Sequence, residues 1–330
     1  YGMLLPLCGT GNHAQRVRSS DSNSAVAFTL SHCRATCGNT ECDVSLAIDC
    51  GLEMHKMRVG LIGCGNIGAD VCIALQKGDI PAEIAALTDI DRSRAEFLAS
   101  TYRLSATICD LEENAASVDF LVECADAGVV ANVVDAAIRH RRDCLILSLG
   151  GLLTAPELFE AARQHGVQIW LPSGALAGLD GVRAGREGGL HRVTLTTRKP
   201  PRGLEGAPYL AERGICLDGL NEPQVVFDGT ALEAVKAFPK NVNVAAALSF
   251  AGIGPERTRV RVIADPRATA NSHEIVAEGA FGRLVAMTEN LPSPRNAKSS
   301  YLASLSGCAE LRAAAEAFVM HRGEGAGRCC

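Results

Sequence analysis

The sequence predicts an α/β protein in which a doubly wound parallel sheet is followed by a second α+β domain with an open, mainly antiparallel sheet. Three observations lead to this prediction. Strand-like and helix-like segments alternate between residues 57 and 172, a glycine-rich motif joins the first strand to the first helix, and the later strands alternate apolar and polar residues. We expect the first domain at 57–172 and the second at 173–300.

The first domain should be one parallel sheet covered by helices. Short apolar runs predict strands at 58–62, 84–87, 120–124, 145–147 and 168–171. Helical periodicity predicts helices at 66–77, 92–102, 129–139 and 155–165. Strands that alternate with helices in this way form parallel sheets with right-handed crossovers.

The pattern changes after Pro172. Val193, Leu195 and Thr197 alternate with polar neighbours, and strands are also expected at 260–264, 274–278 and 283–288. Such alternation is typical of an antiparallel sheet with one packed face and one available face. A helix is expected at 243–250, and an Ala- and Leu-rich helix at 301–320 should return to the first domain.

Residues 1–56 differ from the rest, because they mix Ser, Asn, Thr and Cys without clear periodicity. We expect a poorly ordered extension here, and a gene start placed too early is an alternative, since Met57 opens the first strand. No metal site is expected, because the spacing of this segment's histidine and cysteines matches no compact zinc pattern. These residues are His32, Cys33, Cys37, Cys42 and Cys50.

Composition excludes several classes of protein. The net charge is −5, and no run of Lys or Arg could follow a phosphate backbone. The apolar stretches are shorter than the ~20 residues that span a bilayer. The 14 cysteines are scattered, as expected of reduced thiols in a cytosolic protein. We therefore expect a soluble cytoplasmic protein that binds neither nucleic acid nor a membrane.

The glycine motif predicts a Rossmann-type dinucleotide site, because it follows a strand and opens a helix. Gly63 permits the tight turn, Gly65 lets the backbone approach a pyrophosphate, and Gly68 allows close packing of helix on strand. A helix begins near Asn66, and its first residues, Asn66 and Ile67, direct free N–H groups and the positive end of the helix dipole toward the phosphates.

Asp89, at the end of the second strand, is the expected partner of the adenosine ribose. Its carboxylate can accept hydrogen bonds from both ribose hydroxyls, which favours NAD over NADP. Arg92 lies close enough in sequence to pair with a 2′-phosphate instead. The predicted cofactor is therefore NAD or NADP.

The chain resembles the L-aspartate dehydrogenase family over about residues 57–320. The order and spacing of several short segments carry the resemblance: IGCGNIG at 62–68, LPSGALAGLD at 171–180, TRKP at 197–200, FDG at 227–229, KNVNVAAA at 240–247, IADP at 263–266, NSHEI at 271–275 and NAKSS at 296–300. Leu176-Ala177 replaces the family's more usual Ile-Gly, and the 296–300 segment lacks its usual Pro. The first departure could reshape the loop at the nicotinamide. The second should alter only the stiffness of its own loop.

The resemblance implies roles for three residues. His273 matches the family's active-site histidine, and Ala175 and Asn243 match its cofactor contacts. The residues alone allow other interpretations, since His273 could be a surface or strand-packing histidine and Asn243 a helix cap, for which Asn241 is an equal candidate. An imidazole titrating near neutrality could exchange protons with an amine, an imine or water.

A dicarboxylate substrate needs cationic donors. Four cations lie in the matching segments, and each could equally be a solvated charge. Lys240 is the first choice because it adjoins Asn243, and the others are Arg198, Lys199 and Lys298.

These observations predict an NAD(P)-dependent oxidoreductase that interconverts L-aspartate with iminosuccinate or oxaloacetate and ammonium. The resemblance also implies a homodimer and a place in NAD biosynthesis. One alternative is another two-domain reductase of an aspartate-derived substrate, such as a homoserine dehydrogenase or dihydrodipicolinate reductase. The other is a non-catalytic NAD(P)-binding regulatory protein, which would tolerate changes at His273.

Overall fold

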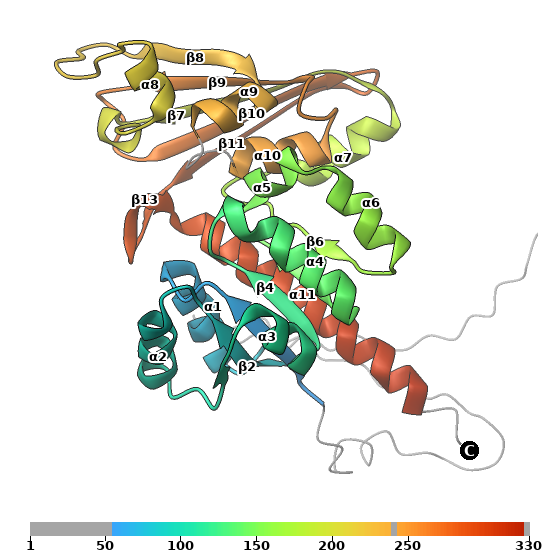
Figure 1. Cartoon of the computed structure of the whole chain (residues 1–330). Helices are drawn as coiled ribbons and strands as arrows, with labels where there is room; N and C mark the ends of the chain where they lie inside the picture. The colour runs from blue at the N-terminus through green and yellow to red at the C-terminus, as the bar shows by residue number, and fades with distance from the viewer. Residues whose placement is uncertain (1–54, 239–242, 327–330) are drawn as a thin grey trace, which may run out of the picture. The chain divides into compact units, whose positions relative to one another are not determined.

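The computed structural model describes residues 55–238 and 243–326, which belong to one compact unit. The predicted extension, apart from its last two residues, lies outside this range, as do the cysteines considered above as zinc ligands. The described residues build two main sheets (Figure 1).

The first sheet is parallel throughout and has the strand order β3-β2-β1-β4-β5-β6. This order confirms the predicted doubly wound fold, with its change of direction between β1 and β4. On β1, Val59 and Leu61 are fully buried on one face and Ile62 is buried on the other, as expected for a strand covered on both faces. The strands are β1 (Met57–Ile62), β2 (Ala82–Thr88), β3 (Thr107–Ile108), β4 (Phe120–Glu123), β5 (Asp143–Ile146) and β6 (Ile169–Trp170).

The helices that connect these strands include two that the sequence did not predict, α3 and α5. Helix α3 is short and begins at the cap Asp110, which accepts from the N–H of Glu113. Helix α5 contains Gly150 and Gly151, which weaken helical propensity. A Cβ on Gly151 would lie 2.7 Å from the carbonyl oxygen of Ala127, so close packing requires glycine there. The helices are α1 (Asn66–Gln76), α2 (Arg92–Thr101), α3 (Leu111–Ser117), η2 (Ala127–Val129), α4 (Val130–His140), α5 (Leu149–Thr154) and α6 (Glu157–Gln164).

Helix α11 (Tyr301–Ala326) packs against α1 and β1, although it follows the second sheet in sequence (Figure 1). Leu311 and Ala315 are buried in the same apolar cluster as β1. The thiol of Cys308 lies 3.8 Å from the carbonyl oxygen of Asp70, and Arg312 forms an ion pair with Asp79 at 2.8 Å. The end of the chain therefore stabilises the glycine-motif helix.

The second sheet has the order β11-β10-β7-β9-β8. Only β7 and β9 pair in parallel, and the other three pairs are antiparallel, which confirms a mainly antiparallel sheet. Strand β8 was not predicted. The strands are β7 (Leu190–Lys199), β8 (Gln224–Thr230), β9 (Thr258–Ala264), β10 (Asn271–Gly279) and β11 (Gly282–Asn290).

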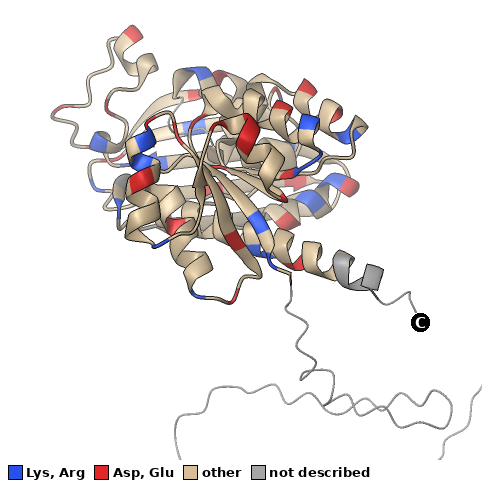
Figure 2. Cartoon of the chain, turned by 60° about the horizontal axis from the view of Figure 1, so that its bottom comes forward, with Lys and Arg blue, Asp and Glu red and all other residues tan. Residues whose placement is uncertain are grey.

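One face of this sheet is covered by helices, and we call it the inner face. It buries residues such as Leu195, Val262 and Ile275 under α7, α9 and α10 (Figure 1). The opposite, outer face carries ion pairs such as Arg192–Glu278, and charges of both signs are interspersed over the surface (Figure 2). The remaining elements are α7 (Leu179–Glu187), η3 (Pro201–Gly203), α8 (Pro208–Glu212), α9 (Ala231–Ala237), α10 (Asn243–Ala251), β12 (Pro292–Ser293) and β13 (Asn296–Ser300). In the described residues, no helix is long and apolar enough to cross a bilayer.

Candidate active site

The three glycines of the motif occupy three different environments. Gly63 has φ +99°, and a Cβ there would lie 2.7 Å from the backbone nitrogen of Ala125. A Cβ on Gly68 would lie 2.6 Å from the carbonyl oxygen of Gly63. A Cβ on Gly65, in contrast, would meet no heavy atom within 4 Å. The turn is therefore closed on the protein side and open at Gly65, where a ligand could approach the backbone.

The start of α1 and the end of β2 complete a site that fits a dinucleotide. Gly65 provides no side-chain cap, and the first turn of α1, beginning at Asn66 and Ile67, contains no acidic residue. Its N–H groups are thus available to an anion. Asp89 lies beside this turn, because its carboxylate accepts from the N–H of Cys64 at 2.7 Å. Arg92 forms an ion pair with Glu96 at 3.0 Å.

His273 lies on the inner face of the second sheet, in a row of residues that the strand register aligns. Thr288, His273, Thr197 and Val262 are successive partners across β11, β10, β7 and β9. His273 is 4% exposed, and its Nδ1 lies 3.0 Å from the hydroxyl oxygen of Thr197. The hydroxyl therefore fixes the orientation of the ring.

The same row is joined to the loop that follows the parallel sheet. Thr288 donates to the carbonyl oxygen of Ala175 at 2.8 Å, and the amide of Asn290 donates to the same oxygen at 3.2 Å. Because Thr288 is the register partner of His273, these bonds place the predicted cofactor residue Ala175 next to the predicted catalytic residue.

Asn243 is brought to the same region from α10. Its side-chain oxygen accepts from the N–H of Gly150, in the helix that follows β5, at 3.2 Å. The next residue, Val244, lies 3.8 Å from where a Cβ on Gly174 would be. The start of α10, the 174–175 loop and the inner sheet face therefore converge near the carboxyl ends of the parallel strands, where open α/β sheets bind their ligands.

Burial changes the acid–base chemistry of His273. Desolvation, together with the nearby charge of Lys199, lowers the pKa of the imidazole to about 3. The expectation from the sequence that this imidazole titrates near neutrality is therefore wrong. The physical reason is that a buried ring loses the hydration that stabilises its cationic form.

Lys199 shares the inner face with His273 and is 6% exposed. Burial lowers the pKa of its ammonium group to about 8. Lys199 and Thr197 line a small cavity of about 10 Å³ under the start of α10, which contributes Val244 and Ala245. The other described residues that line the cavity are apolar, so among them the ammonium of Lys199 is the group that carries a positive charge.

Of the other three predicted substrate cations, the structure places Arg198 on the outer face, and it does not describe the side chains of the other two. Arg198 alternates with its neighbours on β7, so it lies on the outer face, and it forms an ion pair with Asp265 at 2.8 Å. Lys240 lies outside the described residues, and so does the side chain of Lys298.

Sequence reasoning missed one buried carboxylate, that of Glu123 at the end of β4. Its side chain is fully buried and accepts from the backbone N–H groups of Ala125 and Ser148 and from the Ser148 hydroxyl, at 2.8–2.9 Å. Burial raises its pKa to about 6. A Glu ending an otherwise apolar strand was the available signal.

Family models match both halves of the chain. The model described as "Homoserine dehydrogenase, NAD binding domain" matches residues 63–172, and the model described as "Aspartate dehydrogenase, C-terminal" matches residues 180–314. The first half is thus an NAD-binding domain, as predicted.

Full-length relatives agree with these matches. L-aspartate dehydrogenase of Methanosarcina mazei is 47% identical over 78% of this chain and 96% of its own length, and that of Bradyrhizobium diazoefficiens is 38% identical over 78% and 91%. The chain belongs to the L-aspartate dehydrogenase family. Among solved structures of the family, aspartate dehydrogenase from Thermotoga maritima matches with a TM-score of 0.58 at 24% identity, over 78% of this chain and 94% of that one. That match supports the fold.

Because of His273, the free energy of unfolding of this family member should decrease as the pH is lowered. Its folded pKa is about 3 against an ordinary 6.5, so below pH 6.5 the unfolded chain takes up a proton that the folded chain excludes. Between pH 7.5 and pH 5 the free energy of unfolding should drop by about 2 kcal/mol from this group. Urea denaturation of wild type and His273→Asn at both pH values measures the difference.

The exposed His191 provides the matched control, since His191→Asn should keep the wild-type pH dependence. Other titrating groups contribute equally to all three proteins, so they cancel in the comparison. Identical pH dependence of wild type and His273→Asn would contradict the buried, neutral imidazole.

Proposed function

We propose that this chain is an L-aspartate dehydrogenase that uses NAD or NADP to interconvert L-aspartate with iminosuccinate, which water converts to oxaloacetate and ammonium. The observation that carries the proposal is the placement of His273 and Lys199 on one buried face, joined through Thr288 to the loop at Ala175. The sequences of named L-aspartate dehydrogenases support the choice of substrate.

The dinucleotide would be held by the glycine turn, the start of α1 and Asp89 on one side, and by Ala175 and Asn243 on the other. When bound, its nicotinamide supplies the acceptor or donor of the substrate's C2 hydride. The role of the protein is then to orient the substrate, exclude water and move protons.

Lys199 would bind a substrate carboxylate in this scheme. An anion beside a desolvated ammonium favours its charged form and forms a charge-assisted hydrogen bond. The cavity beside Lys199, at about 10 Å³, has room for about one water, so aspartate would have to displace part of its lining.

His273 would accept the proton that the substrate's amino group releases as C2 is oxidised. Thr197 holds Nδ1, which leaves Nε2 for the substrate. Two entering carboxylates would raise the pKa of the imidazole from its ligand-free value, because a nearby negative charge stabilises the cation. In the reverse direction the same nitrogen would return the proton.

Aspartate-dependent reduction of NAD or NADP tests the activity directly. Wild type should form reduced cofactor with L-aspartate, and His273→Ala should lose turnover by about 10²–10⁴-fold, as expected when a proton-transfer group is removed. His191→Ala should behave as wild type. L-homoserine serves as the rival substrate. Cofactor binding without turnover on L-aspartate would refute the proposal.

Lys199→Met tests the carboxylate site. The change should lower kcat/KM for L-aspartate by about 10²–10³-fold, because the substrate carboxylate loses its cationic partner in a desolvated site. The dissociation constant of the cofactor should stay unchanged. Lys236→Met on the exposed face of α9 is the matched control, and equal kcat/KM in the two variants would exclude this role.

We further propose that the protein is a cytoplasmic homodimer. The cysteines of the described chain are free thiols, in keeping with a reducing compartment. The outer face of the second sheet exposes Val285 (49%) and Met287 (56%) on the edge strand β11, and toward the opposite edge it carries ion pairs such as Arg259–Asp228. Such a face can be complementary to itself.

Light scattering after size-exclusion chromatography tests the dimer. Met287→Asp should shift wild-type dimers toward monomers, because a carboxylate would be buried without a partner in the interface. Phe97→Asp, on an exposed apolar residue of α2, should leave the mass unchanged. A monomeric wild type would exclude the proposed interface.

A further inference from the structure

Glu123 is a buried carboxylate that the proposed chemistry does not use. It ends β4, the strand next to β1 at the change of direction in the parallel sheet. One carboxylate oxygen accepts from the N–H of Ala125 and from the hydroxyl of Ser148, and the other accepts from the N–H of Ser148. These three donors are all neutral.

Such a group destabilises the fold at neutral pH. Transfer of a carboxylate out of water is costly, and neutral donors offset only part of that cost. The raised pKa of Glu123 reports the remaining penalty. A burial of this kind is common at functional sites, where the charge has a task other than stability.

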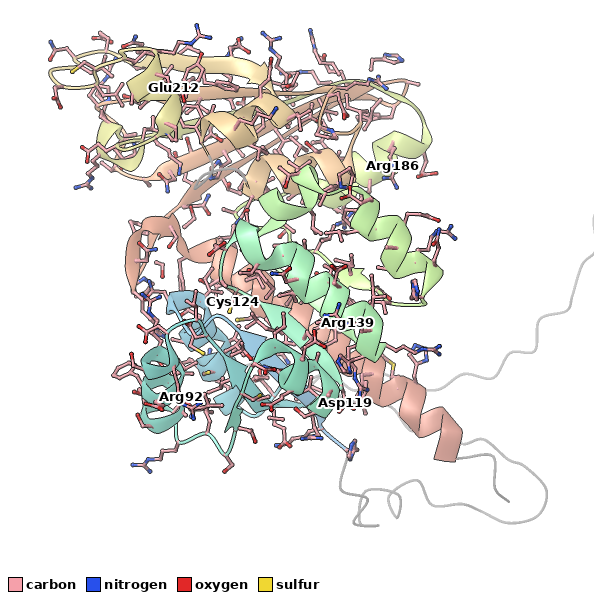
Figure 3. The ribbon with its side chains drawn as sticks, in the orientation of Figure 1. Arg92, Asp119, Cys124, Arg139, Arg186 and Glu212 are labelled. Atoms are coloured by element: carbon pink, nitrogen blue, oxygen red, sulfur yellow. The ribbon has the colours of Figure 1, made fainter. Side chains whose placement is uncertain are left out.

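The three donors come from the two segments that follow β4 and β5, at the carboxyl ends of these parallel strands. Ala125 lies in the loop after β4, and its backbone nitrogen is the atom that a Cβ on Gly63 would meet at 2.7 Å. Cys124 belongs to the same loop (Figure 3). Its thiol lies 2.9 Å from the carbonyl oxygen of Gly63. This loop therefore packs directly against the glycine turn.

The second loop, which follows β5, leads toward Asn243. Ser148 directly precedes α5, and two residues later the N–H of Gly150 donates to Asn243. The carboxylate of Glu123 thus connects, through Ser148, with the region where Ala175, Asn243 and His273 converge. One side chain fixes the spacing between the glycine turn and that region.

We propose that Glu123 is a positioning residue for the dinucleotide, whose carboxylate locks the loops after β4 and β5 at the spacing that cofactor binding requires. The inference rests on the proposed cofactor function. Glu123 acts through Ala125 and Ser148, and the affinity for the cofactor depends on its ionised form.

Glutamine cannot replace Glu123 in this role. One carboxylate oxygen faces the N–H of Ala125 and the other faces the N–H of Ser148. Either orientation of a glutamine amide therefore directs its NH₂ group at a backbone N–H. The two donors would repel, and one loop would shift from its position.

Protonation should have a related effect at low pH. The neutral acid loses its charge-assisted bonds to the two backbone N–H groups and must donate its own proton. The described titratable groups that interact with Glu123 electrostatically are Cys124 and Cys144, whose pKa values burial raises, so both stay uncharged. On the adjacent strands, Arg58 and Asp143 lie at the opposite end of β4.

Among the described residues, the other charged groups on the adjoining loop and helix point away from Glu123. Asp126 is exposed and caps η2 by accepting from the N–H of Gly128. Helix α4 packs on β4, and its ionisable residues are Asp135 and, in the last turn, Arg139 and His140. All three lie away from the first turn of the helix, which is the end that follows the loop after β4.

Calorimetric titration of the full-length protein with NAD⁺, without substrate, tests the inference. At pH 7.5, Glu123→Gln should raise the dissociation constant about tenfold or more. Glu83→Gln, the same change at an exposed position of β2, should leave it unchanged. Between pH 7.5 and pH 5 the wild-type dissociation constant should rise with a midpoint near 6, and that of Glu123→Gln should stay flat. A merely structural residue would not produce this matched loss of pH dependence.

Each other outcome also decides the question. An unchanged dissociation constant in folded Glu123→Gln, or a flat wild-type profile, would overturn the role of Glu123 and leave the proposed enzyme intact. A wild type that binds neither NAD⁺ nor NADP⁺ would overturn both. If Glu123→Gln does not fold, the wild-type pH profile and Ser148→Ala, which removes one of the three donors and should weaken binding more modestly, give the answer.

Discussion

The candidate site depends on two hydrogen bonds to the carbonyl oxygen of Ala175. This oxygen accepts from Thr288 and Asn290, two residues on the inner face of the second sheet, while its own loop follows the last strand of the parallel sheet. Thr288 and His273 are paired in the register of β11 and β10, so the hydrogen bond that holds Thr288 also fixes the position of His273. A slip of one residue would turn the imidazole to the outer face and separate it from the loop.

Three ionisable side chains in the two domains are buried, and the pKa of each departs from its ordinary value. Glu123 and Lys199 are shifted toward their neutral forms, and His273 is neutral at all physiological pH values. The common cause is loss of hydration. An anion that enters such a site stabilises the charged form of a buried ammonium group such as that of Lys199.

Much of the fold could be predicted because the signals are local. Strand and helix periodicities in the first domain follow from neighbouring residues, and the glycine motif needs only its flanking strand and helix. The unpredicted elements are short or depend on tertiary contacts. Helix α5 forms across two glycines because the chain must pass close to Ala127, and the parallel pairing of β7 with β9 joins segments far apart in sequence.

The sequence by itself determined the class of fold, the glycine turn and the identity of the residues to examine, because these depend on residue type and spacing. Only the tertiary structure decided which of them meet. Strand alternation places Lys199 inside and Arg198 outside, although they are neighbours in sequence. Burial, which no single position in the sequence specifies, makes His273 a neutral imidazole and Glu123 a carboxylate that joins two loops.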